Sequence, residues 1–328
     1  MSKNTQNLND QASRDAKIAA LQKKYSKHGK KAQETVSNRL RMHPAVKVVL
    51  YIFLILMAFI TIVPLLYALS GSFKTNQEVL SGINLIPKNF TLENYGKVWN
   101  MDPTGSGGVR SDANYAVFTW NSIKVSLLTV VFTLFMTSLC AYTFQRGSFP
   151  GQKVLYWLYL GTMFIGAGTI TIFPLLQLTT KLGMNNHLGL AILQSSVTGA
   201  SNLFLTMGYL KTISKELDDA ARIDGCSFIG TYFRVILPLS KPILATIALM
   251  AFRGSWNNFL MPRLMLADPK ISTLVVQVVK LRSSGGEGIT SYNLMLTGTV
   301  FAAIPMIIVF LFFNRWFIAG ITAGSVKG

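Results

Sequence analysis

Side chains able to take part in chemistry are concentrated in a polar stretch from Lys215 to Pro242. Ser214 precedes a helical pattern whose first turns are acidic, which suits an N-cap hydroxyl and the positive end of a helix dipole. Gly225 directly follows Asp224 and predicts the end of that helix. The carboxylates alternate with alanines instead of clustering, so the pattern does not indicate a site that makes or breaks bonds.

A second short helix is expected over about 227–235, ending before Pro238. On the first helix four residues share one small, nearly flat face at i, i+3, i+4 and i+7: Leu217, Ala220, Ala221 and Asp224. This spacing fits a helix-turn-helix that docks into a groove of a soluble partner. It also fits a loop that is amphipathic only because it lies on lipid headgroups.

The polar stretch lies between apolar segments long enough to cross a bilayer. The chain has 328 residues, of which 50% are hydrophobic and 13% charged, and this composition predicts an integral membrane protein. Six segments approach the roughly 20 residues that a spanning helix needs. They are expected at about 46–70, 119–144, 154–178, 188–210, 242–266 and 294–318.

The distribution of cationic residues predicts which segments lie inside the cell. Residues 1–45 form a polar, basic tail, with eleven Lys and Arg up to Lys47, and no signal-peptide core precedes it. Lys and Arg flank the apolar spans as the positive-inside rule expects, which argues against a nucleic-acid binder despite the net charge of +18. Both termini and the polar hairpin are therefore expected in the cytoplasm. The tail suits either an anchor near anionic lipid or a contact with a specific partner.

The fifth predicted span carries an unusual polar group. Counting from Pro242 at the inner face places Arg253 near the bilayer midplane, where a cation is costly and should face a cavity or a partner charge. Trp256, Asn257 and Asn258 follow, and aromatic and amide groups suit the C–H faces and hydroxyls of a sugar. A buried ion pair with another subunit is the structural alternative for Arg253.

Several functional classes lack their residues. The sequence has no G-x-x-x-x-G-K-[ST] phosphate loop, and His28, His43 and His187 are isolated, so neither ATP binding by that loop nor a metal site is expected. Cys140 and Cys226 predict no disulfide. An ion-coupled secondary transporter is the alternative function, but all thirteen Asp and Glu lie outside the predicted spans, whereas proton coupling usually needs an intramembrane carboxylate.

The hairpin resembles the signature loop of membrane subunits of ATP-binding-cassette (ABC) importers. The resemblance rests on an acid-Ala-Ala triplet, a glycine and a final apolar-x-Leu-Pro run, with Asp219 where Glu is usual and Val235 where Ile is usual. In that family the loop is a coupling helix that sits in a cleft of the ATPase subunit. The resemblance implies this role for Glu216, Asp219, Ala220, Ala221, Asp224, Gly225, Leu237 and Pro238.

Three further segments are similar to sugar-importer permeases of the maltose-transporter type: IPKNFTLENYGKVW, FRGSWNNFLMP and the C-terminal NRWFIAGITAGSVKG. The second favours a substrate-pathway role for Arg253, Trp256, Asn257 and Asn258. In those permeases the outer loop before the last span reaches into the solute-binding protein, which implies this contact for Ser284, Gly285 and Gly286. Their C-terminal tail inserts between the ATPase subunits, which implies such contacts for Val326, Lys327 and Gly328.

The resemblance therefore implies an all-α, polytopic membrane protein with six transmembrane helices and the type I ABC importer permease fold. It implies a basic tail over 1–45, a permease domain over 46–318 with its coupling hairpin at 211–241, and a C-terminal cytoplasmic tail over 319–328. The chain is expected to be the transmembrane subunit of an ATP-driven importer that moves a sugar, most simply an oligosaccharide, from an external solute-binding protein across the cytoplasmic membrane. It is not expected to be an enzyme itself. A second homologous permease and two ATPase subunits are the implied partners, with ATP and Mg on the ATPase and no cofactor bound by this chain.

Overall fold

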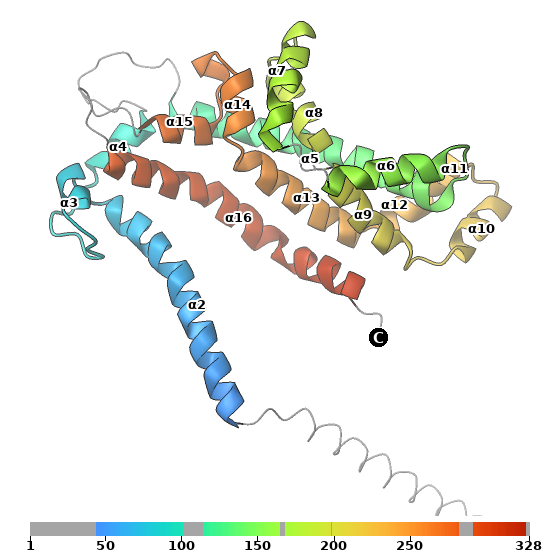
Figure 1. Ribbon diagram of the computed structural model, residues 1–328, viewed down its shortest axis with the longest axis horizontal. Helices are drawn as coiled ribbons and strands as arrows, with labels where there is room; N and C mark the ends of the chain where they lie inside the picture. The colour runs from blue at the N-terminus through green and yellow to red at the C-terminus, as the bar shows by residue number, and fades with distance from the viewer. Residues whose placement is uncertain (1–43, 101–113, 165–167, 198, 282–290, 326–328) are drawn as a thin grey trace, which may run out of the picture. The chain divides into compact units, whose positions relative to one another are not determined.

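The structure, a computed structural model, describes residues 44–100, 114–164, 168–197, 199–281 and 291–325. Within these ranges the chain is built from helices and contains no strand (Figure 1). The chain divides into two compact units, Met1–Leu65 and Leu66–Gly328, and the division falls inside α2 (Pro44–Gly71). Because α2 has 28 residues and a mean hydropathy of 2.9 over its most apolar window, it is long and apolar enough to cross a membrane.

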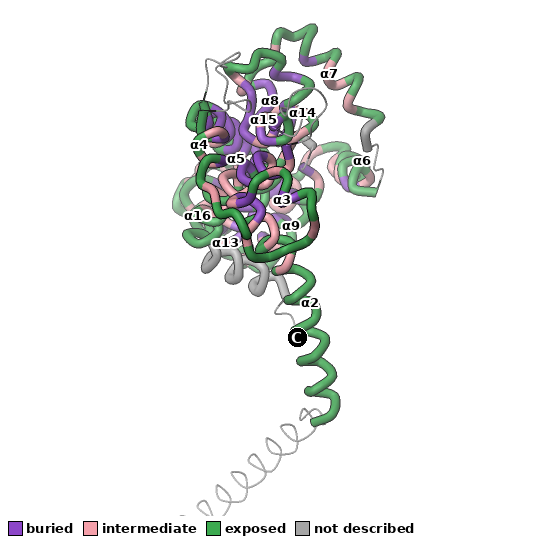
Figure 2. Tube along the Cα trace, turned by 90° about the vertical axis from the view of Figure 1, so that its left-hand side faces the viewer, coloured by how far each residue is buried: buried purple, intermediate pink, exposed green. Residues whose placement is uncertain are grey.

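The second unit is organised around three helices that pack side by side. The central helix α13 (Lys241–Trp256) packs against both α5 (Tyr115–Arg146) and α16 (Tyr292–Ser325). On its other sides α5 contacts α8 (His187–Val197) and α9 (Gly199–Leu210). Figure 2 shows buried residues gathered where these helices meet and exposed residues on the outside.

Close packing around α5 follows from a stripe of small hydroxyl residues on its buried face. Small side chains let membrane helices approach closely, and a hydroxyl group in a helix can donate to a carbonyl of the preceding turn. Thr129 shows this, because its hydroxyl donates to the carbonyl of Val125 at 2.9 Å. The stripe repeats at intervals of three or four residues: Ser122, Ser126, Thr129, Thr133 and Thr137.

Five of the six predicted spans correspond to helices or helix pairs that meet the length and composition of a span. Three are the single helices α2, α5 and α16, and two are bent pairs, α8 with α9 and the helical stretch Phe228–Leu239 with α13. The second pair bends by 79°. Among the described residues, the predicted fourth span is thus a broken helix. The 79° bend separates the hairpin from α13 at the start of the predicted fifth span.

The third predicted span, 154–178, differs most from expectation. Helix α6 is described over Gln152–Phe164, and the described chain resumes with a 3₁₀ turn, η1 (Gly168–Thr171), that leads into α7 (Ile172–Lys181). Neither α6 nor α7 is long enough alone to span a bilayer. Pro174 lies near the start of α7, where a missing N–H is tolerated.

Short helices at the end of the unit opposite the hairpin are held by polar contacts. They are α3 (Asn76–Leu80), α4 (Glu93–Trp99), α14 (Leu260–Met265), η3 (Pro269–Ile271) and α15 (Leu274–Lys280). The Asn121 side chain donates to the carbonyls of Lys270 and Ser272 at 2.9 and 3.1 Å, and Ser122 accepts from the N–H of Leu274 at 2.8 Å. The connection after α14 is therefore fixed to the start of α5.

Glu78 organises the loop between α3 and α4. Its two carboxylate oxygens accept from the N–H groups of Lys88 and Asn89, at 2.7 and 3.2 Å. The Lys88 bond above all, then the Asn89 bond and the Lys74 charge, lower the pKa of Glu78 against the opposing effect of burial. Lys74 also donates to the carbonyl of Asn84. The side chains of Glu78 and Lys74 therefore both hold the backbone of this loop, and we call these contacts the clamp.

We predict that Glu78→Ala raises amide hydrogen exchange of Lys88 and Asn89 at neutral pH, by about tenfold, because both N–H groups lose a charged acceptor. Since the folded-state pKa of Glu78 is lowered, its stabilisation is complete above the ordinary carboxyl pKa and disappears as pH falls through the folded value. Exchange detected by mass spectrometry on peptides covering 81–92, corrected for intrinsic rates, measures both effects. Glu93→Ala is the matched control, because Glu93 pairs only locally with Lys97 on α4. Equal exchange in the two variants would contradict the clamp.

Candidate functional site

The hairpin begins with α10 (Glu216–Ile223), whose N-cap is Lys215, one residue after the predicted Ser214, and which ends before Gly225 as the sequence predicts. The Ser214 hydroxyl accepts from the N–H of Glu216 at 3.2 Å. Gly225 has a φ of +81°, the left-handed conformation that favours glycine after a helix. The acidic first turn, the serine and the glycine thus define this helix locally.

The second half of the hairpin runs further than predicted. It comprises α11 (Phe228–Thr231), a π-helical turn η2 (Tyr232–Ile236) and α12 (Leu237–Leu239), with Ser227 capping its start through the N–H of Gly230. The expectation that it ends before Pro238 is wrong. A proline ring clashes with the carbonyl four residues earlier, and the wider π turn ahead of Pro238 lets the helix continue to Leu239.

The predicted flat face of α10 is divided between the interior and the surface. Ala221 is buried, with 5% of its surface exposed, and it packs against this chain. Leu217, Ala220 and Asp224 are exposed. Beside them Ile223, which the sequence analysis did not single out, is 87% exposed and is the most accessible apolar side chain of the hairpin.

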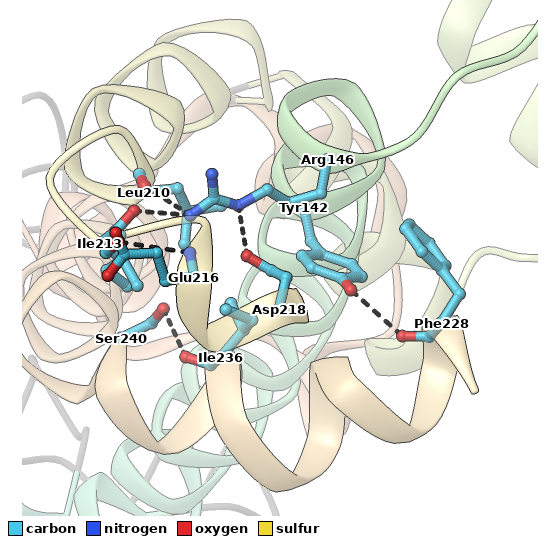
Figure 3. A network of polar contacts seen from close by, with 10 residues as sticks. Tyr142, Arg146, Leu210, Ile213, Glu216, Asp218, Phe228, Ile236 and Ser240 are labelled. Carbon is cyan, nitrogen blue, oxygen red and sulfur yellow. Dashed lines mark hydrogen bonds and ion pairs between the residues drawn. The ribbon is translucent and has the colours of Figure 1, made fainter. Parts of the chain in front are cut away.

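A buried ion pair attaches α10 to the end of α5. Arg146 Nε lies 3.1 Å from Asp218 Oδ2, and the two side chains are only 5% and 9% exposed. The same guanidinium donates through Nη2 to the carbonyl of Ile213 at 2.6 Å and, at 3.5 Å, to that of Leu210 at the end of α9 (Figure 3). One side chain therefore holds three segments: α5, the end of α9 and α10.

Aromatic residues attach the second half of the hairpin to the same helix. Tyr142 donates to the carbonyl of Phe228 at 3.2 Å, and its ring lies 4.5 Å from the Phe228 ring. The hydroxyls of Ser138 and Tyr232 lie 2.6 Å apart and share a hydrogen bond. Both halves of the hairpin are therefore fixed to the last turns of α5.

The four residues singled out on the fifth span lie in different surroundings. Arg253 is exposed in the last turn of α13 and forms no ion pair with another described residue. Trp256 is buried and donates its indole N–H to the carbonyl of Ala302 at 3.1 Å, so it supports the contact with α16. Asn257 is the exposed C-cap of α13. Asn258 lines a cavity of about 320 Å³.

Other predicted contacts lie outside the described residues. These are Ser284, Gly285 and Gly286 in the loop before α16, Val326, Lys327 and Gly328 at the C-terminus, and the basic tail up to residue 43. In the described ranges, no three His, Cys, Asp or Glu side chains gather where they could hold a metal ion.

Sequence reasoning missed the Arg146–Asp218 pair. The pattern treats Asp218 only as one of the acids in the first turns of the helix and Arg146 only as one of the cytoplasmic cations that flank the spans. One available signal was an arginine at the end of a long apolar span, because a buried cation needs a partner. Sequence spacing alone gives no means of choosing which of the hairpin acids that partner is.

We predict that Arg146→Met and Asp218→Leu each lower the free energy of unfolding by about 3–5 kcal/mol, because each leaves the other charge buried without its partner. The double change should cost much less than the sum of the two, since it leaves neither charge. Thermal unfolding in detergent, analysed as a double-mutant cycle, measures this coupling. Lys153→Met removes an exposed cation of α6 and is the control. Strictly additive single changes would exclude an energetically important pair.

Comparison with known proteins agrees with this geometry. Residues 125–323 match the family described as binding-protein-dependent transport system inner membrane component. The arabinooligosaccharides transport system permease protein AraQ of Halalkalibacterium halodurans is 36% identical over 276 residues, covering 83% of this chain and 93% of the relative. The trehalose/maltose transport system permease protein MalG of Thermococcus litoralis is 30% identical over 290 residues, covering 86% and 97%.

A solved structure shares the fold. A subunit of a bacterial ABC transporter involved in the import of the acidic polysaccharide alginate superposes with a TM-score of 0.68 at 23% identity, covering 83% of this chain and 96% of that one. The predicted resemblance and the all-α type I permease fold are confirmed. The chain belongs to the family of inner-membrane permease components of binding-protein-dependent ABC transport systems.

Proposed function

We propose that this chain is one of two homologous membrane subunits of an ATP-driven importer that moves a saccharide across the cytoplasmic membrane. A solute-binding protein would deliver the saccharide, and two ATPase subunits would bind ATP and Mg and hydrolyse the ATP. The observation that carries the proposal is the hairpin, whose outer face is exposed while its inner face is fixed to α5 by the Arg146–Asp218 pair. A surface that is both accessible and rigidly attached can transmit the movement of a partner into the bundle.

The exposed and buried residues of the hairpin have different roles in this proposal. Glu216, Asp219, Ala220 and Asp224 contact the ATPase, and their exposure supports this. Ile223 is assigned to the same contact because it is the most exposed apolar side chain of the hairpin. Four other residues shape the hairpin. Ala221 lies on the buried face of α10, and Gly225 forms the turn after that helix. Leu237 and Pro238 are part of α12, the helix that ends before the 79° bend.

A saccharide is the proposed substrate because the two relatives named above are described as permeases for arabinooligosaccharides and for trehalose and maltose. Arg253, Asn257 and Asn258 are assigned to the pathway at the outer end of α13, and Trp256 positions that end through its bond to α16. Ser284, Gly285 and Gly286 remain the proposed contacts with the solute-binding protein. Val326, Lys327 and Gly328 remain proposed contacts with the ATPase.

The proposed topology places both termini in the cytoplasm. Residues 1–45 are then a basic cytoplasmic tail, 46–318 the permease domain with its hairpin at 211–241, and 319–328 a cytoplasmic tail. Helix α16 extends to Ser325, so most of that last segment continues the final span as helix. Cationic residues flanking the spans support this orientation.

We predict that Asp219→Lys combined with Ile223→Asp lowers ATP-driven saccharide uptake by the complete importer in proteoliposomes by at least about tenfold. The reason is that it reverses a charge and places a carboxylate in an apolar contact at one docking surface. Co-purification of the ATPase with the permease should fall in parallel. These two positions are exposed, so the change does not disturb the buried face on which Ala221 lies.

Lys153→Glu is the matched control, because it reverses an exposed charge at the start of α6, outside the hairpin. It should leave uptake and co-purification near those of the unchanged chain. Full uptake by the double variant would refute the coupling role. Uptake that continues without ATP or an ATPase would refute the importer itself and favour an ion-coupled carrier.

A further inference from the structure

A cavity of about 320 Å³ lies where α5, α7, α8, α13 and α14 meet. Its volume is at the lower end of the range of small-molecule sites, about 300–1,000 Å³. Thr129 places it near the middle of the long helix α5. Most of the wall is apolar: Ile172, Leu175, Leu193, Ala251, Leu260 and Met261.

Three buried polar side chains from three different helices converge on this cavity. Thr129 of α5 is 2% exposed, and Gln194 of α8 and Ser255 of α13 are each 7% exposed. The Thr129 hydroxyl oxygen lies 3.2 Å from Gln194 Oε1 and 3.3 Å from Ser255 Oγ. The three side chains therefore form one connected polar group beside an apolar wall.

This group cannot satisfy all its own hydrogen bonds. A threonine hydroxyl has one proton, and the nearest acceptor for that of Thr129 is the carbonyl of Val125 at 2.9 Å. Gln194 Nε2 is buried and has no hydrogen-bond partner among the described residues. Exchanging the amide oxygen and nitrogen would only place the oxygen at that position. A buried amide group without a partner costs free energy, which a ligand hydroxyl would recover.

The cavity also discriminates by charge. None of the described residues that line it is charged, so a carboxylate entering it would lose its hydration without meeting a cation. A sugar hydroxyl both donates and accepts hydrogen bonds, and sugar C–H groups pack on aliphatic side chains. The chemistry of the walls therefore fits an uncharged polyol ring and disfavours a uronic acid.

We propose that this cavity binds one neutral sugar unit of the transported saccharide, with the Gln194 amide, aided by Thr129 and Ser255, hydrogen-bonding its hydroxyls. This inference rests on the proposed import function and adds to it a substrate class and a binding site. On this proposal the main substrate contacts are made by Thr129, Gln194 and Ser255, and not by Arg253 or Trp256. Asn258, at the rim, belongs to both sets.

The test uses the complete importer in proteoliposomes with three radiolabelled probes: arabinotriose, maltotriose and trigalacturonic acid. The unchanged importer should take up at least one neutral trisaccharide and not the acidic one. Gln194→Leu should lower that uptake by about tenfold, the effect of losing one well-formed hydrogen bond to a buried group. Ser255→Ala should also lower uptake of the neutral trisaccharide.

Thr133→Val is the matched control, because Thr133 is a buried hydroxyl on the next turn of α5 that does not line the cavity. It should leave uptake near the unchanged value. Unchanged uptake with Gln194→Leu, an equal loss with Thr133→Val, or efficient uptake of trigalacturonic acid would each overturn the proposal.

Assembly of each variant complex is measured alongside uptake. If Gln194→Leu fails to assemble, Gln194→Asn decides, because it keeps the amide but withdraws it from the cavity and should also reduce uptake. If uptake of a neutral probe continues without ATP or an ATPase, the import function fails together with the site. If uptake depends on ATP and Gln194→Leu does not change it, only the proposed binding site is refuted.

Discussion

The guanidinium of Arg146 is a constraint on which the position of the hairpin depends. A buried cation must be neutralised and hydrogen-bonded, and this one meets Asp218 on α10 and the carbonyls of Ile213 and Leu210. Because those partners belong to consecutive segments, satisfying one side chain fixes the end of α9, the turn and the start of α10 together. Tyr142, one turn earlier on α5, fixes the second half of the hairpin.

A second constraint is that polar groups inside a membrane bundle must find partners within the protein. On α5, Thr129 meets it by donating to the carbonyl of Val125, whereas Ser126 and Thr133 have no hydrogen-bond partner among the described residues. The small side chains of the stripe let α8, α9 and α13 pack closely against α5. The same requirement makes the unpartnered Gln194 amide informative. Other buried groups among the described residues also have no partner, but of these only Gln194 lines the cavity, so its amide is the one that a ligand could reach.

Local chemistry was predictable from sequence, and long-range pairing was not. Ser214, the acidic turn and Gly225 define α10 through contacts within a few residues, so the pattern predicted them correctly. Pro238 misled, because the π turn that accommodates it depends on packing of Tyr232 against Tyr142 and Ser138 of a distant helix. Asp218 and Arg146 lie far apart in the chain, and nothing in periodicity distinguishes the buried acid from its exposed neighbours. Hydropathy likewise located the spans but did not predict the 3₁₀ turn η1 that precedes α7.

On the proposed function, α5 connects the two working parts of the chain. Its last turn holds the hairpin through Arg146, and its middle presents Thr129 to the cavity, roughly 25 Å away along one continuous helix. A helix of 32 residues without an internal proline does not absorb a movement applied at its end, whereas a broken helix can. The other helices that line the cavity are shorter: α7, α14, α8, which is bent against α9, and α13, which begins directly after the 79° bend. A displacement of the hairpin would therefore move Thr129 relative to Gln194 and Ser255, and so change the hydrogen-bonding group offered to the substrate.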